Sequence, residues 1–224
     1  MLNSSDPWEH HVEDNFLSQD EFNIVREYSS KCFYRFKTEN RFHMVMSDLR
    51  FYKETRKDHE LGVVVDRIFE QYRGWFEELY ERNLSKFYML KEFVIIDGNF
   101  HYPPHTDAPS KVISSILYVS DEGEGTRLSK NKKMEEPHQI EWKPNRLLSF
   151  ARTKNTWHDY FCAGKRISFN LLFIERLPTN KVFLRNPTMP PSVARQQGLH
   201  LLSRRIQHRA EEAKHKYENN DFRS

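Results

Sequence analysis

Three side chains that can ligate a metal ion stand at a spacing suited to one site: His105-Thr106-Asp107 and, 51 positions after Asp107, His158. Alternate residues of a strand project to one side of a sheet, so His105 and Asp107 can bind a single ion at the mouth of a barrel. Pro103-Pro104 excludes a helix there. Two imidazole nitrogens and one carboxylate oxygen form a facial triad, which leaves open positions and suits non-haem Fe(II). We therefore predict an iron site at His105, Asp107 and His158.

An arginine and a serine follow at a spacing that suits carboxylate binding. Arg166 lies eight residues after His158 and just after Gly164, where we expect a turn. An arginine on the next strand could reach into the barrel and bind the carboxylate of a co-substrate through a paired contact. Ser168 shares the face of Arg166 and could add a hydroxyl. The pair predicts an anionic co-substrate beside the metal.

The conjunction of these residues carries more weight than any one of them. Chance pairs are expected in a chain with 11 histidines, and His11-Val12-Glu13 is a pair without downstream partners in strand settings. Alone, His158 would ordinarily be a surface or hydrogen-bonded histidine, and Arg166 a salt-bridge residue. Their order and strand settings together predict the site.

Closely spaced strands surround these residues. We expect turns at Asp97-Gly98-Asn99 and at Pro144-Asn145, and no helical pattern interrupts the region. This pattern of closely spaced strands and turns predicts an antiparallel barrel or sandwich of jelly-roll type. The expected strands span residues 87–90, 93–96, 112–119, 126–128, 139–142, 146–150 and 167–174.

Helical patterns precede the strands. Residues 8–16 could be an edge strand, and Ser18 with Glu21 forms a capping box that begins a helix reaching to about Ser30. A second helical period runs from Asp58 to about Asn83, with Gly74 inside it as a possible point of close approach. Residues 31–57 are compatible with short strands or with an irregular wrap.

A further helix is expected at the carboxyl end. A proline-rich excursion from Pro178 precedes a helical period over residues 192–217. Its apolar seam can pack on the barrel, and the spacing also suits a helix pair that would form a homodimer. The expected organisation is one domain over residues 1–224, with support in 1–86, a β core in 87–177, and a linker and helix in 178–224.

Composition argues against several other classes of protein. Lys plus Arg exceed Asp plus Glu by only three among 224 residues, which argues against a nucleic-acid partner. Cys32 and Cys162 are far apart and fit reduced thiols of a cytoplasmic protein. No apolar run reaches the length of a membrane span or a signal peptide.

The stretch from about Tyr88 to Leu177 resembles the Fe(II)- and 2-oxoglutarate-dependent dioxygenases, particularly their prolyl-4-hydroxylase-like branch. The amino-terminal residues 8–17 also resemble the lead-in strand and helix of that branch. The matching residues of the core are His105-Thr106-Asp107, Ile116-Leu117-Tyr118-Val119, Gly125-Thr126, Pro144-Asn145-Arg146-Leu147-Leu148-Ser149-Phe150, His158 and Arg166-Ile167-Ser168.

The resemblance implies a mainly β fold, a double-stranded β-helix (a cupin-like jelly roll) buttressed by the amino-terminal helices. It implies Fe(II) on His105, Asp107 and His158, with 2-oxoglutarate chelating the iron and O2 as oxidant. The far carboxylate of 2-oxoglutarate would bind Arg166. By its position on its strand, Tyr118 matches a tyrosine that hydrogen-bonds this carboxylate in relatives.

The sequence departs from the resemblance at one point. Relatives often carry another tyrosine one strand before the first ligand, where this chain has Ile95 or its neighbours; Tyr102 is an alternative contributor. Retention of Asp107 favours hydroxylation over halogenation. Demethylases of the superfamily carry a second arginine six residues after the first, and Leu172 stands there, which argues against a nucleic-acid substrate.

We therefore predict a hydroxylase that acts on a peptidyl or small-molecule C–H bond and releases succinate and CO2. The alternative from another class is a cupin-like barrel that binds a metal or ligand without turnover. Product formation separates the two functions.

Overall fold

The computed structural model describes residues 2–36, 41–45 and 59–175. Most of this chain is strand, in one antiparallel sheet with the order β1-β2-β8-β5-β9-β4-β3, and β6 pairs with β9 and β7. The helices are α1 (Gln19–Phe36), α3 (His59–Gln71) and α4 (Arg73–Leu79). The strands are β1 (Leu2–Ser4), β2 (His10–Glu13), β3 (Arg41–Val45), β4 (Phe87–His105), β5 (Lys111–Tyr118), β6 (Arg127–Ser129), β7 (His138–Gln139), β8 (Leu147–Ala151) and β9 (Trp157–Glu175).

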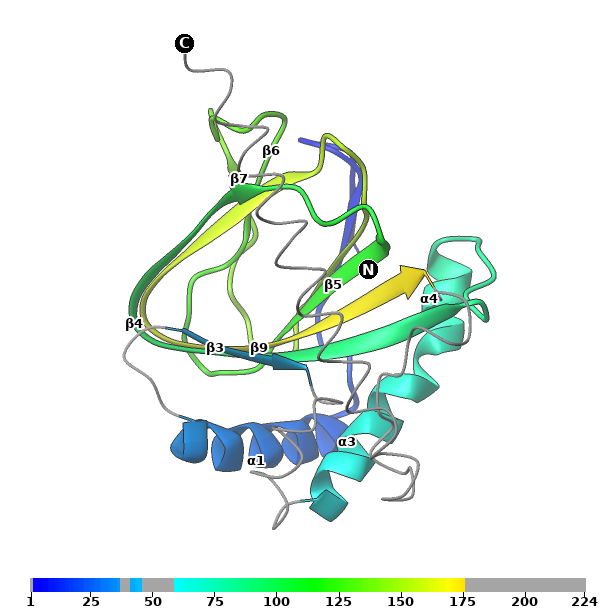
Figure 1. Ribbon diagram of the computed structural model, residues 1–224, viewed down its shortest axis with the longest axis vertical. Coiled ribbons are helices and arrows are strands. Elements are labelled where there is room, and N and C mark those ends of the chain that lie inside the picture. Colours follow the sequence, from blue (N-terminus) through cyan, green and yellow to red (C-terminus); the bar gives the residue numbers. More distant parts are fainter. Residues whose placement is uncertain (1, 37–40, 46–58, 176–224) are drawn as a thin grey trace, which may run out of the picture.

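The sheet curls on itself, and helices α1 and α3 lie along its outer face (Figure 1). One strand serves both halves of the curl: β9 pairs with β6 at Asp159↔Arg127 and with β5 at Ser168↔Tyr118. The expected mainly β jelly roll with flanking helices is confirmed. The carboxyl-terminal helix expected over 192–217 lies outside the described residues, and with it the seam for a dimer.

A long two-stranded ribbon of β4 and β9 connects the halves of the curl. The predicted turns at Asp97-Gly98-Asn99 and at Gly164 are wrong, because both strands run through these glycines. Gly98 and Gly164 face each other in the register, and Gly98 has φ 121°. Each strand keeps its hydrogen bonds to its partner, so the glycines serve to bend a paired ribbon and not to reverse the chain.

Helix α1 begins as predicted and ends later. The Ser18 backbone N–H donates to Glu21 Oε2 over 3.0 Å, as a capping box requires. The helix continues six residues beyond Ser30 to Phe36, because its buried face continues through Cys32 and Phe33. The first part of the segment predicted as strands or a wrap is therefore helical.

Two other amino-terminal predictions are wrong in detail. The helix expected over 58–83 is two helices, α3 and α4, separated at Tyr72, whose hydroxyl donates to Glu21 on α1 over 2.8 Å. A Cβ added at Gly74 would meet nothing within 4 Å, so this glycine permits no close approach. At Gly62 the added atom would lie 3.3 Å from Tyr28, so the tight packing of α3 on α1 lies there.

The amino-terminal strand also differs from its prediction. β2 is not at the edge of the sheet, because it pairs with β8 on one side and with β1 on the other. The short segment before Trp8 supplies β1, which pairs with β2 at Leu2↔Val12 and Ser4↔His10.

Aromatic packing joins the helices to the outer face of the sheet. Phe69 of α3 packs on Phe169 of β9 with ring centroids 5.0 Å apart, and Phe76 of α4 packs on Phe173 at 5.1 Å. These rings belong to one large apolar cluster between helices and sheet. The inner face of the curl is therefore left for other side chains. Among the described residues, no helix has the length and apolar character needed to cross a membrane.

Candidate metal centre

The structure brings His105, Asp107 and His158 together at one end of the curl. One ligand atom from each lies within 4.8 Å of the others, and His158 Nε2 is 3.9 Å from Asp107 Oδ2. His105 is the last residue of β4 and faces His158 near the start of β9. Asp107 lies two residues beyond the end of β4, not on the strand as predicted, because strand pairing stops at His105.

Both imidazoles are oriented by the backbone. Nδ1 of His105 donates to the Pro103 carbonyl and Nδ1 of His158 donates to the Thr156 carbonyl, each over 3.0 Å. A carbonyl oxygen only accepts, so Nδ1 carries the proton and Nε2 presents a lone pair. Burial, with the neighbouring His158, lowers the pKa of His105 to about 4. His105 is therefore neutral at pH 7, as a metal ligand must be.

A lysine holds the aspartate in place. Burial alone would raise the pKa of Asp107, but the Lys111 ammonium, 2.6 Å from Oδ1, outweighs it and keeps this pKa well below its usual range. Lys111 takes one carboxylate oxygen and leaves Oδ2 toward His158. Sequence reasoning missed Lys111; its only signal was the four-residue spacing from Asp107, which is common in salt bridges.

A cationic end of the cavity lies farther along β9. Arg166 is buried; its Nη1 donates to Ser168 Oγ over 3.2 Å and its Nε to the Glu124 carbonyl over 3.3 Å. Nη2 is buried and has no hydrogen-bond partner among the residues that the structure describes. The predicted turn before Arg166 is absent, so Arg166 and His158 are on one strand, an even number of residues apart and on one face.

Tyr118 lies beside this arginine, but its hydroxyl is engaged. The centre of its ring is 5.9 Å from Arg166 Cζ, and the ring stacks on Trp142 with centroids 4.2 Å apart. The hydroxyl donates to Thr126 Oγ1 over 3.1 Å and accepts from the Thr126 N–H over 3.0 Å. Burial raises the pKa of Tyr118, so the phenol is neutral. The Tyr118 hydroxyl oxygen therefore keeps one free lone pair, and the hydroxyl proton is already donated to Thr126.

Two more tyrosines lie nearer the metal end. Tyr102 contacts His105 edge-on at 4.6 Å and stacks on Tyr160 at 5.5 Å. Tyr160 in turn lies under the Arg166 guanidinium, 4.1 Å from ring centre to Cζ. Sequence reasoning missed Tyr160, although the alternation of β9 from His158 places it on the inner face.

Similarity to known proteins was found at the level of structure. No protein-family model matches the sequence, and no curated protein is similar enough to count as a relative. A prolyl hydroxylase from Trichoplax adhaerens, solved with a hypoxia inducible factor peptide, shares 15% identity with a TM-score of 0.52 over 74% of this chain and 83% of that one. A viral collagen prolyl hydroxylase from Paramecium Bursaria Chlorella virus-1, solved with 2OG, shares 17% identity with a TM-score of 0.52 over 75% and 96%. The chain has the prolyl-hydroxylase fold.

Within the prolyl-hydroxylase fold, the side chains present fit a metal and an anionic co-substrate. Two imidazoles whose Nδ1 atoms bond to backbone carbonyls, leaving Nε2 for a metal, and one carboxylate are a donor set for a divalent non-haem metal. The buried, unpartnered Nη2 of Arg166 fits a carboxylate, because buried donors ordinarily have partners.

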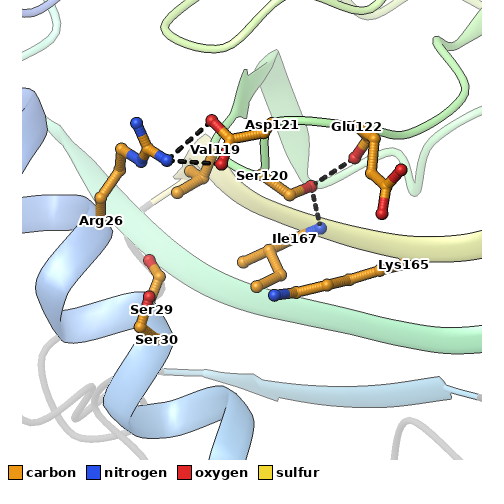
Figure 2. A pocket seen from close by; sticks show the side chains of 9 residues that line it. All are labelled: Arg26, Ser29, Ser30, Val119, Ser120, Asp121, Glu122, Lys165 and Ile167. Carbon is orange, nitrogen blue, oxygen red and sulfur yellow. Dashed lines mark hydrogen bonds and ion pairs between the residues drawn. The ribbon is translucent and has the colours of Figure 1, made fainter.

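A polar pocket of about 400 Å³ lies elsewhere, between α1 and the strands (Figure 2). Arg26 of α1 binds both carboxylate oxygens of Asp121 there, at 2.7 and 2.6 Å. Lys165 lines it and, as the neighbour of Arg166 on β9, projects to the opposite side of the sheet. The pocket is therefore separate from the metal centre.

Proposed function

We propose that this protein is an Fe(II)- and 2-oxoglutarate-dependent oxygenase that hydroxylates a C–H bond and releases succinate and CO2. The observation that carries the proposal is that His158, one of the three clustered ligands, shares a face of β9 with the buried Arg166, whose Nη2 has no hydrogen-bond partner among the described residues. The prolyl-hydroxylase fold supports the same conclusion.

The roles of the residues follow from their contacts. His105, Asp107 and His158 would hold Fe(II), whose chemistry with 2-oxoglutarate and O2 supplies the oxidising power. Lys111 keeps Asp107 ionised and leaves Oδ2 for the metal. Arg166, with Ser168 on its Nη1, would bind the far carboxylate of 2-oxoglutarate. Tyr118 would support this end through its ring, whose centre lies 5.9 Å from Arg166 Cζ.

A peptidyl substrate is the first class to test, with small metabolites as the second. One structural neighbour was solved with a peptide, which supports a peptide as substrate. A panel of proline-containing peptides, free amino acids and sugar nucleotides, scored by succinate release, separates these classes. A cupin-like binding barrel would bind a ligand and release neither succinate nor CO2 with any of them.

Anaerobic titration tests the metal and co-substrate assignments together. Fe(II) with 2-oxoglutarate should produce a weak visible charge-transfer band in the wild-type protein. We expect His158→Ala and Asp107→Ala to lose the band, while His138→Ala, at an exposed histidine outside the cluster, retains it. Absence of the band in the wild type, or its survival in His158→Ala, would overturn the assignment.

A further inference from the structure

The inner face of β9 carries a phenol between the metal ligands and the arginine. Residues that alternate along the strand share this face, and pairing with β4 confirms it: Tyr160 faces Tyr102, and Arg166 faces Ile96. Tyr160 is two residues from His158 and six from Arg166, and only 8% of it is exposed. Its position on the wall of the cavity is therefore set by the strand itself.

The hydroxyl of Tyr160 is unpaired within the described part of the chain. Its Oη is buried and forms no hydrogen bond with any residue that the structure describes, and the same is true of Nη2 of Arg166. A buried polar group without a partner carries a desolvation penalty, which a ligand oxygen would relieve. Two such groups lie next to each other, because the guanidinium stands 4.1 Å above the Tyr160 ring.

Of three neighbours of Arg166, Tyr118, Ile96 and Ser168, only Ser168 offers a donor that is free for a ligand. The Tyr118 proton is directed to Thr126, and Ile96, opposite Arg166, is apolar. Ser168 accepts from Arg166 Nη1, and its own hydroxyl proton can still be donated to a ligand. Tyr102 stacks parallel to the Tyr160 ring, with 7° between the planes, and so helps to hold the plane of that ring.

We propose that Tyr160 binds the 2-oxoglutarate carboxylate that Arg166 also binds, by donating its hydroxyl proton to one of the oxygens. The proposal rests on the proposed function, because it takes 2-oxoglutarate as the ligand. An ionised carboxylate has about four lone-pair sites and accepts from both donors at once. Tyr160 is thus a co-substrate-binding residue supplied from the strand that carries His158 and Arg166.

Tyr160→Phe removes only the oxygen and keeps the ring under the guanidinium. Binding is measured by calorimetry on Mn(II)-loaded protein, with 2-oxoglutarate and with oxalate, which can chelate the metal but has no far carboxylate. We expect the Kd for 2-oxoglutarate to rise about tenfold or more, since the acceptor is charged, and the Kd for oxalate to stay unchanged. The affinity for Mn(II) itself should not move.

Tyr80→Phe is the matched control, because it removes a phenolic oxygen that bonds to Ser149 on the helix side of the sheet. We expect its Kd for both ligands to equal that of the wild type. Equal 2-oxoglutarate affinity in Tyr160→Phe and wild type would overturn the Tyr160 assignment and leave the proposed function standing. Equal weakening of both ligands would also overturn it, because Tyr160 would then act at the metal end. Failure of the wild type to bind 2-oxoglutarate would instead defeat the proposed function.

Discussion

The two faces of β9 are chemically opposite, although each buries several side chains. The outer face presents Phe169, Leu171 and Phe173 to the helices, and every one of them lies in the main apolar cluster. The inner face presents His158 and Arg166, which are just as inaccessible but polar. Burial of the first set stabilises the fold, whereas burial of the second set costs free energy unless partners are supplied.

The difference between the two faces indicates where on β9 a ligand is expected to bind. On the outer face, around Phe169 and Phe173, ring packs against ring. On the inner face, Arg166 and Tyr160 each retain a buried polar atom without a partner in the described part of the chain. One face of β9 therefore packs into the apolar core, while the other face carries hydrogen-bond donors that a ligand could use. Each substitution below tests one side of this contrast.

Phe169→Ala should produce the largest loss of stability. Its ring is fully buried against Phe69 and Phe93, with centroids 5.0 and 4.9 Å away. Truncation leaves a cavity, and we expect the free energy of unfolding to fall by about 3–5 kcal/mol in urea denaturation. Phe161→Ala is the control on the same strand, because that ring is 42% exposed; we expect a loss below about 1 kcal/mol. Similar losses of unfolding free energy in the two variants would show that the buried outer face does not stabilise the fold more than an exposed ring does.

Acid should destabilise the metal-free protein through the inner face. The pKa of His105 is about 4 in the folded chain against 6.5 for an ordinary histidine, so the unfolded chain binds more protons between these values. The contribution of His105 to the free energy of unfolding is therefore fully present above pH 6.5 and is lost as the pH decreases toward 4. We expect His105 to contribute on the order of 2 kcal/mol of this loss, after a discount for its partial exposure.

The measurement is a series of urea denaturations with EDTA between pH 7.5 and 4.5. Burial also lowers the pKa values of His10 and His11, so the informative quantity is the difference between wild type and His105→Gln. The variant cannot gain the proton and should show a shallower decline. Identical slopes would mean that His105 titrates normally in the folded chain.

Local patterns in the sequence were sufficient for the fold class. Order and spacing predicted that His105, Asp107 and His158 meet at one site, and the structure brings them together, although Asp107 lies beyond the end of its strand. The capping box at Ser18 and Glu21 predicted the start of α1 because it depends on residues three apart.

Features that depend on distant partners could not be predicted. Gly98 and Gly164 look like turn residues locally, and only their pairing across the ribbon shows that both strands continue. The importance of Tyr160 comes from the absence of a partner, which a local pattern cannot reveal. Lys111 becomes distinctive only when Asp107 is seen to be buried among the ligands.

Arg166→Met should separate binding from stability. It removes a buried charge whose Nη2 has no partner, and an apolar chain of similar length fills the space. We expect the free energy of unfolding to change by less than about 1 kcal/mol, and the 2-oxoglutarate affinity to fall at least tenfold. Urea denaturation and calorimetry measure the two quantities. A loss near that of Phe169→Ala would show that the arginine is mainly a structural residue.

The smallest effect is expected in the polar pocket between α1 and the strands (Figure 2). Arg26 and Asp121 satisfy each other there, but their side chains are 41% and 74% exposed, so solvent and salt screen the pair. A double-mutant cycle of Arg26→Ala and Asp121→Ala should give a coupling of about 0.2–1 kcal/mol that shrinks in high salt. The Kd for 2-oxoglutarate should not change in either variant. Weaker 2-oxoglutarate binding in Arg26→Ala would mean that the ligand reaches the outer side of the sheet, and the separation between the two faces of β9 would be lost.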